Sequence, residues 1–370
     1  MKILIVTLEY PPQIGGIASY VYNFVKHYSL GEAMVYAPVV PGDTEFDAKN
    51  SWKTIRRRPF WGFRPRWFKL LLQLRKIIKQ EQITELYIHH VLPVGYVAYL
   101  LKKNLGIQYT IFLHGTDLEM ATKTRSKAKK FAKVCLAANR VVVNSEFLKN
   151  KLLTKVEDLK NIVVLYPCPG DQFLQPANNE ELDMLRSKLA LNGKKVLLTV
   201  ARMAEGKGFP HLIRLLPQIL QKVPNLVWLV IGDGPKRSML VDMVQKNNLH
   251  NVTRFLGTIP YEDLSKYYQL ADLFVLLTHK DESSEEGWGT VFLEAAASGL
   301  PVVAGRVGGV EEVVDNLRTG LLVDVYQDQS VVSGVADLLR EEKYAHELGV
   351  AGHERVLNEF SWEKQIKKLD

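Results

Sequence analysis

Residues 2–28 have the sequence KILIVTLEYPPQIGGIASYVYNFVKHY, and this stretch is the best guide to the fold of the chain. The run Lys2–Thr7 is apolar and rich in branched side chains, which is typical of a buried strand. After a loop with proline and glycine, the apolar residues between Ile17 and Tyr28 recur at intervals of three and four, on one face of a helix. A buried strand followed by a loop and an amphipathic helix is the repeating unit of a parallel α/β sheet.

The same alternation continues along the chain. Further strands are predicted in the first half at residues 33–37, 86–89, 110–114, 141–144 and 163–166. The second half repeats the pattern with predicted strands at residues 196–201, 227–231, 252–256, 273–277, 302–304 and 321–323. Between the halves, Pro167–Gly170 and Gln175–Asn179 have the composition of a linker. We therefore predict an α/β fold of two doubly wound, Rossmann-like domains, residues 1–172 and 173–354, that face a central cleft.

The charge of the chain is distributed unevenly. The 370 residues include 48 Lys and Arg against 40 Asp and Glu, a net charge of +8. No acid occurs between Asp47 and Glu81, where eleven basic residues, Arg64 and Arg66 among them, are interspersed with six Trp and Phe residues. A second basic run spans Lys123–Lys133. Basic and aromatic residues together suit an anionic membrane surface. The alternative is a solvated helix face whose aromatics belong to the core, whereas no nucleic-acid-binding motif accompanies the charge.

Composition also bears on location. No apolar stretch approaches the roughly 20 residues that cross a bilayer, and the first residues form a strand without the features of a signal peptide. The two cysteines, Cys135 and Cys168, are too few for a disulfide framework. We expect a cytoplasmic protein that associates peripherally with the inner face of the membrane.

Glycines and cations follow several predicted strands. Gly15 and Gly16 open the first helix, where free N–H groups favour a phosphate, although the G-x-G-x-x-G fingerprint of dehydrogenases is missing. Arg202 and Lys207 follow the predicted strand at residues 196–201, and Gly232 and Gly234 follow the one at 227–231. Gly308-Gly309 form another glycine pair after the strand at 302–304. Each glycine pair alone could be a turn, and the two cations could be solvated. Together at one sheet edge they predict a cradle for a nucleotide diphosphate.

The segment from Glu286 to Glu294 contains two carboxylates with seven residues between them. Glu286 is predicted in a loop and Glu294 about one turn into a helix, and the residues between them include Gly287, Trp288, Gly289 and Thr290. Carboxylates accept hydrogen bonds from sugar hydroxyls, and the glycines expose N–H groups at the helix N-terminus. A chance acidic run is the alternative, because Glu285 precedes the segment.

Several motifs together resemble those of a known family. They are Pro11–Ile17, His114-Gly115-Thr116-Asp117, Arg202 with Lys207, Gly232-Asp233-Gly234-Pro235, the pair Glu286/Glu294 and Phe360-Ser361-Trp362. In these features nearly the whole chain resembles the retaining GT-B glycosyltransferases of glycosyltransferase family 4. Residues 9–21 and 286–309 are most similar to the bacterial phosphatidylinositol mannosyltransferases, which use GDP-mannose.

The resemblance implies a role for individual residues. Gly16 would contact the donor phosphate, His114 the donor sugar and Glu294 the ribose. Arg202 and Lys207 would hold the diphosphate, and Glu286 the sugar hydroxyls. The C-terminal helix, residues 355–370, would cross back to the N-terminal domain. One departure is the segment Pro167–Asp171, where the family has Pro-Asn-Gly-Val-Asp.

These observations predict a glycosyltransferase that moves a hexose from a nucleotide sugar to a lipid-linked or glycan acceptor. GDP-mannose is the favoured donor and a UDP-hexose the next. No D-x-D motif is present, so no metal or other cofactor is expected and Arg202 with Lys207 would stabilise the leaving diphosphate. The resemblance implies same-face attack at the anomeric carbon, which the residues alone do not decide.

Three points stay open from the sequence. His114 could be a base or a hydrogen-bonding partner of the donor sugar. Asp117, Arg64 and Arg66 are candidates for contact with the acceptor. A sugar-nucleotide epimerase of the same fold, or a membrane-binding module without activity, are alternative functions.

Overall fold

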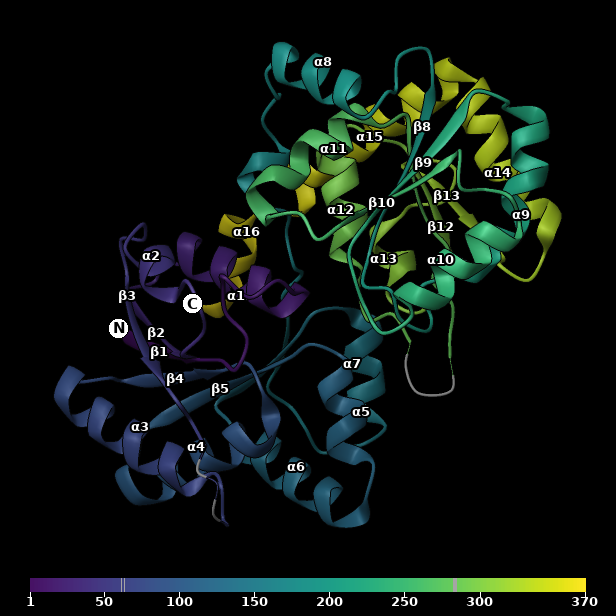
Figure 1. The fold of residues 1–370 in the computed structure, drawn as a ribbon. Helices are drawn as coiled ribbons and strands as arrows, with labels where there is room; N and C mark the ends of the chain where they lie inside the picture. Colours follow the sequence, from purple (N-terminus) through teal and green to yellow (C-terminus); the bar gives the residue numbers. More distant parts are fainter. Residues whose placement is uncertain (61, 63, 282–284) are drawn as a thin grey trace. The chain divides into compact units, whose positions relative to one another are not determined.

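The computed structural model describes residues 1–60, 62, 64–281 and 285–370 and divides the chain into two units (Figure 1). The first unit contains Met1–Pro167 and Trp362–Asp370, and the second contains Cys168–Ser361. This division lies five residues before the predicted boundary between residues 172 and 173, and Phe173 packs against Tyr261 and Tyr268 of the second unit. The chain returns to the first unit at Trp362 rather than at residue 355. Within the described ranges, no helix is both long and apolar enough to cross a membrane.

The first unit is built on a parallel sheet of seven strands in the order β3-β2-β1-β4-β5-β6-β7. Its strands are β1 (Lys2–Val6), β2 (Glu32–Pro38), β3 (Lys53–Arg57), β4 (Glu85–Ile88), β5 (Gln108–Leu113), β6 (Arg140–Val143) and β7 (Ile162–Val164). Its helices are α1 (Gly16–His27), α2 (Asp43–Asp47), α3 (Phe68–Glu81), α4 (Tyr96–Leu105), α5 (Thr116–Thr122), α6 (Arg125–Ala137), α7 (Glu146–Leu153) and α16 (Trp362–Ile366). A π-helical turn, Val91–Gly95, precedes α4, and a 3-10 turn, Lys367–Leu369, follows α16.

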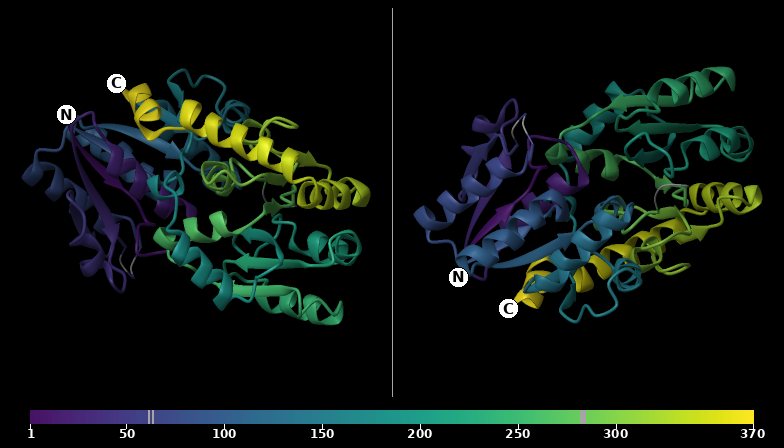
Figure 2. Two further views of the ribbon diagram at one scale, coloured as in Figure 1. Left: turned by 90° about the horizontal axis from the view of Figure 1, so that it is seen from above. Right: turned by 90° about the horizontal axis from the view of Figure 1, so that it is seen from below.

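Helix α1 confirms the prediction from its apolar spacing. Its residues Tyr20, Val21, Phe24 and Val25 are buried. The C-terminal α16 packs beside α1, where Trp362 contacts the rings of Tyr20 and Phe24. Figure 2 shows this yellow C-terminal segment beside the purple helix of the same unit.

The basic stretch after Asp47 is not a single amphipathic helix. Residues 53–57 form the edge strand β3, and α3 begins only at Phe68. The Arg56 guanidinium is 10% exposed and makes a two-pronged ion pair with Asp47. The Trp52 indole donates to the Tyr10 hydroxyl at 2.8 Å, and Phe60 and Trp67 pack against the core. These three aromatics therefore have packing roles, while Trp61 and Phe63 lie outside the described residues.

The second unit contains a parallel sheet of six strands in the order β10-β9-β8-β11-β12-β13. Its strands are β8 (Lys195–Val200), β9 (Leu226–Ile231), β10 (Thr253–Gly257), β11 (Leu273–Leu276), β12 (Val302–Gly305) and β13 (Leu321–Val323). Its helices are α8 (Asn179–Lys188), α9 (Phe209–Lys222), α10 (Arg237–Lys246), α11 (Leu264–Leu270), α12 (Thr290–Ala297), α13 (Val310–Val313), α14 (Asp328–Arg340) and α15 (Glu342–Glu359). Two 3-10 turns, Asp171–Phe173 and Tyr261–Asp263, complete it.

Strand order decides where a ligand can bind in each unit. In each sheet the strand order reverses at the first strand, because β1 lies between β2 and β4, and β8 lies between β9 and β11. The loops after these strands diverge toward opposite faces, which opens a crevice at the carboxyl ends of the strands. The residues that follow β1, β4 and β5 in one unit, and β8, β9 and β11 in the other, are therefore the candidates for a site.

Candidate active site

The loops after β8 and β9 lie in backbone contact. The N–H of Met203 donates to the carbonyl of Asp233 at 2.9 Å, and the N–H of Lys236 donates to the carbonyl of Met203 at 3.0 Å. A Cβ on Gly232 would lie 2.0 Å from the Ala201 carbonyl oxygen, and one on Gly234 would lie 2.5 Å from that of Met203. Only glycine allows this approach. The two predicted glycines thus fix the loop that carries Arg202 and Lys207.

The two cations on this loop have different surroundings. Lys207 forms an ion pair with the carboxylate of Glu286, which lies in the loop before α12. Arg202 is exposed, and within the described part of the chain its guanidinium has no hydrogen bond or ion pair. One cation is therefore held by a carboxylate while the other is available to an anion.

Glu286 is held in its ionised form. Burial would raise its pKa, but the neighbouring Lys207 and the N–H groups of Trp288 and Gly287 outweigh that effect and lower it. The Gly309 N–H donates to the Glu286 carbonyl at 3.0 Å, and a Cβ on Gly309 would lie 2.0 Å from the Gly287 carbonyl oxygen. The second glycine pair thus positions the backbone around Glu286.

Glu294 lies in a different electrostatic environment. It belongs to α12, whose N-terminal boundary is Gly289, with φ of 84°, followed by Thr290. The side chain is 5% exposed and accepts a hydrogen bond of 2.9 Å from the Tyr268 hydroxyl. Burial raises its pKa to about 7, although hydrogen bonds from Tyr268 and Tyr261 act in the opposite direction. The two glutamates therefore differ in charge near neutral pH, which the sequence could not show.

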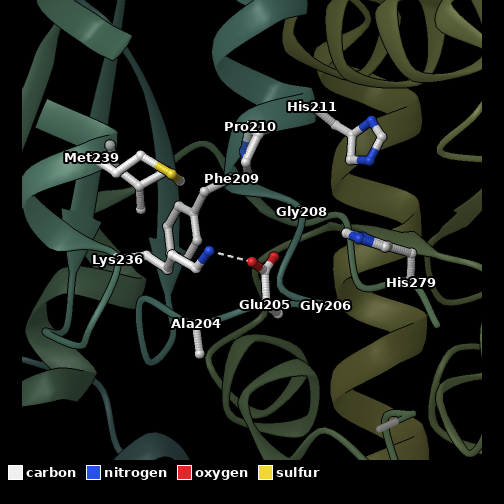
Figure 3. Close-up of a pocket in the computed structure, with 11 residues that line it drawn as sticks. Ala204, Glu205, Gly206, Gly208, Phe209, Pro210, His211, Lys236, Met239 and His279 are labelled. Atoms are coloured by element: carbon white, nitrogen blue, oxygen red, sulfur yellow. Dashed lines mark ion pairs between the residues drawn. The ribbon is translucent and has the colours of Figure 1, made fainter. Parts of the chain in front are cut away.

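A pocket of about 200 Å³ lies beside the Arg202–Lys207 loop (Figure 3). The ion pair between Lys236 and Glu205 borders it, and the rings of His211 and His279, 4.9 Å apart, line the opposite side. Ligand pockets usually have about 300–1,000 Å³, and none of the predicted donor contacts lines this one.

The carboxyl edge of the first unit brings histidines together. His114 follows β5, and His89 and His90 follow the neighbouring strand β4. His89 Nδ1 lies 3.2 Å from His114 Nε2, and His90 Nε2 lies 3.6 Å from a Glu9 carboxylate oxygen. Burial lowers the pKa of His114 to about 3, with a smaller contribution from His90. His114 is therefore neutral at physiological pH.

The other predicted residues of this unit lie as follows. Gly15 and Gly16 begin α1, and nothing lies within 4 Å of the position of a Cβ on Gly16, so the backbone there is accessible. Asp117 Oδ1 accepts the N–H groups of His114, Gly115 and Leu118 at 3.0–3.1 Å, and its Oδ2 is buried. This geometry favours a role in holding the His114 loop.

Arg64 and Arg66 are exposed in the segment before α3. The structure gives no specific partner for the acceptor role predicted for them.

Comparison with known proteins agrees with this arrangement. Residues 14–168 match the family described as Glycosyltransferase Family 4, and residues 183–355 match Glycosyl transferases group 1. The chain is a glycosyltransferase.

Curated relatives of this glycosyltransferase cover most of its length. A GDP-mannose-dependent alpha-(1-6)-phosphatidylinositol monomannoside mannosyltransferase of Mycolicibacterium smegmatis is 27% identical over 99% of the chain and 96% of the relative. N-acetyl-alpha-D-glucosaminyl L-malate synthase of Bacillus anthracis is 24% identical over 86% of the chain and 81% of the relative. These two relatives differ in the sugar that their names give, which leaves the donor of this chain to be tested.

Solved structures share the fold of this glycosyltransferase. Anabaena HepE, solved with UDP-glucose, has a TM-score of 0.84 at 18% identity, with 100% of this chain and 99% of that chain covered. Sucrose-phosphate synthase of Thermosynechococcus elongatus has a TM-score of 0.81 at 21% identity, with 100% and 97% covered. The prediction of a GT-B fold is confirmed.

Four residues of the two clusters were not predicted from the sequence: Glu9, His89 and His90 of the first unit and Tyr268 of the second. Three of them come from loops after strands, which is a signal that sequence analysis could have used. Tyr268 lies in the middle of α11 and carries no such signal.

Proposed function

We propose that this glycosyltransferase transfers a hexose, with retention of configuration and without a metal ion, from a nucleotide-diphosphate sugar to a lipid-linked or glycan acceptor. The contact between Lys207 and Glu286 carries the proposal, together with Arg202 on the same loop, which has no ion-pair partner among the described residues. It joins a cation suited to a diphosphate and a carboxylate suited to sugar hydroxyls. The names of the mannosyltransferase relatives favour GDP-mannose, and the HepE complexes make a UDP-hexose the next candidate.

The residues of the second unit have different roles in the proposed donor site. Arg202 and Lys207 stabilise the negative charge that grows on the departing phosphate, and cations fixed before the reaction do this without reorganisation. When Lys207 turns to the diphosphate, Glu286 is free to accept hydrogen bonds from the sugar. Glu294 accepts hydrogen bonds from the ribose hydroxyls. The acceptor hydroxyl attacks the face that the diphosphate leaves, and the leaving phosphate takes its proton.

The test is turnover of labelled GDP-mannose and UDP-glucose with a crude lipid extract. Arg202→Ala and Lys207→Ala should each lower kcat by about 10²–10³-fold, which is typical for the loss of one preorganised charge. Arg214→Ala is the matched control, because Arg214 pairs with Asp328 on the surface of α9 and α14. Near-normal turnover in both loop variants would remove the assignment. An isomerised free nucleotide sugar, without label in the lipid, would indicate an epimerase.

We also propose that the first unit binds an anionic membrane surface from the cytoplasmic side. Helices α3, α4 and α6 pack side by side against one face of its sheet (Figure 1). Their exposed basic residues are Arg75, Lys76, Lys79, Lys103, Arg125, Lys127, Lys129, Lys130 and Lys133. Phe68, Leu72 and Leu136 are exposed on the same helices. Basic residues near an anionic leaflet contribute about 1 kcal/mol each.

Two sets of substitutions test whether the membrane is bound by helices α3, α4 and α6 or by the arginines before α3. The first is Lys127→Ser with Lys129→Ser, and the second is Arg64→Ser with Arg66→Ser. Arg56 is left unchanged because it holds Asp47. Sedimentation with vesicles that contain anionic phospholipid should fall most in the first set and should be released by high salt. Equal binding to neutral vesicles would contradict the proposal.

A further inference from the structure

His89 and His114 form a pair in which only one ring nitrogen of His89 has a partner. His89 is fully buried, and its ring stacks on Phe112 with centroids 4.4 Å apart. Its Nδ1 lies 3.2 Å from His114 Nε2. Its Nε2 is buried and has no hydrogen-bond partner among the described residues. The two rings therefore share a single hydrogen bond whose direction depends on the tautomers.

Both rings are neutral near physiological pH. Burial lowers the pKa of His89 well below its usual range, and the adjacent His114 and His90 add to this effect. Two neutral rings joined through one nitrogen of each can place only one proton between them. Either His114 Nε2–H donates to His89 Nδ1, or His89 Nδ1–H donates to His114 Nε2.

The unpartnered Nε2 of His89 distinguishes these two arrangements. In the first, the proton of His89 would sit on Nε2, where no acceptor is found within the described ranges. In the second, Nε2 carries only a lone pair. Buried N–H groups without an acceptor are rarer in proteins than acceptors that lack a donor. The second arrangement is therefore favoured.

We propose that His89 is a positioning residue that donates its Nδ1–H to His114 Nε2 and so fixes His114 as the tautomer with its proton on Nδ1. His114 is partly exposed, and none of the described residues makes a hydrogen bond with its Nδ1. Its Nδ1–H is then a donor for an oxygen of the substrate, such as a sugar hydroxyl. Its Nε2 is occupied and does not take up a proton. His114 acts as a neutral hydrogen-bond donor and not as a general base. This role rests on the proposed function, in which His114 meets the donor sugar.

The tautomers can be observed directly in the full-length chain. In ¹⁵N NMR spectra of protein labelled at histidine, recorded at pH 7, we expect His89 and His114 both to carry the proton on Nδ1. Spectra of His114→Gln and His89→Asn provide the assignment. A proton on His114 Nε2, or a rapidly exchanging mixture of both tautomers, would overturn the proposal. This measurement needs no substrate, so its outcome is independent of whether the chain transfers a sugar.

Two substitutions connect the tautomer to activity. His89→Leu removes the donor, so the His114 signal should change to a mixture of tautomers and kcat should fall by about tenfold, as for the loss of one hydrogen bond. His89→Asn places an amide near the position of Nδ1 and should restore both the signal and most of kcat. Nucleotide diphosphate affinity should stay within twofold in both variants, because neither histidine is among the predicted contacts of the diphosphate. A His89→Leu spectrum that still shows His114 protonated on Nδ1 alone would contradict the proposal.

Discussion

Replacing Glu294 by Gln should make the free energy of unfolding less dependent on pH. The side chain is 5% exposed and its pKa is about 7 in the folded protein, raised by burial. In the unfolded chain a glutamate ionises near pH 4.3. As the pH rises above that value, the unfolded chain loses this proton while the folded protein retains it. The unfolded state then binds fewer protons, so Glu294 lowers the free energy of unfolding progressively until the pH passes about 7.

The magnitude follows from the difference between the two pKa values. One unit corresponds to about 1.4 kcal/mol, so the wild-type chain should lose about 2–3 kcal/mol between pH 5 and pH 8 through this group. Gln retains the shape and can accept the hydrogen bond from Tyr268 without a charge. Glu294→Gln should therefore resemble the wild type at pH 5 and exceed it by about 2 kcal/mol at pH 8.

Urea unfolding followed by circular dichroism at pH 5, 6.5 and 8 measures this difference. Glu354→Gln is the matched control, because Glu354 is exposed on α15 and its replacement should have the same small effect at every pH. A Glu294→Gln variant whose stability relative to the wild type is the same at pH 5 and pH 8 would refute the reasoning. It would mean that the carboxyl group is ionised in the folded protein throughout this range.

Three further outcomes are expected. Gly309→Ala should reduce activity at least tenfold with the fold retained by circular dichroism, because its Cβ would lie 2.0 Å from the Gly287 carbonyl oxygen. Arg56→Lys should lower the free energy of unfolding by about 1–3 kcal/mol in urea titrations, because the two-pronged pair with Asp47 and the bond to the Pro38 carbonyl are lost. Excess EDTA should leave turnover unchanged; loss of activity that Mg²⁺ or Mn²⁺ restores would contradict the metal-free mechanism.

The fold could be predicted because local patterns determine it. The helix from Gly16 has an apolar periodicity that is typical of a helix, and the strand at Lys2–Val6 is a short run of branched apolar residues followed by a loop. Strand β3 was missed for a physical reason. It lies at the edge of the sheet, and its sequence KTIRR contains three basic residues, two of which form ion pairs with residues outside the strand. Lys53 pairs with Glu81 and Arg56 with Asp47, so the charges that suggested a surface for membranes partly serve packing.

The candidate site was predicted residue by residue but not as a set of contacts. Glu286 and Lys207 could be selected from their place after strands, yet their ion pair spans 79 positions in the sequence. Gly308 and Gly309 could be recognised as a turn, but the carbonyl groups that exclude a side chain belong to Glu286 and Gly287. Such contacts depend on how the loops lie against one another, which composition does not encode.

The order of the strands in each sheet determines which of the predicted residues come into contact. His89 and His114 are 25 positions apart and meet because β4 and β5 are neighbours in the sheet. The loops of Lys207 and Glu286 meet in the same way, because β8 and β11 are neighbours. In both units the neighbouring strand changes the properties of the predicted residue. His89 occupies one nitrogen of His114, and Lys207 keeps Glu286 ionised. The role of a residue at the end of a parallel strand therefore depends on the strand beside it, and it can be assigned only once that strand is known.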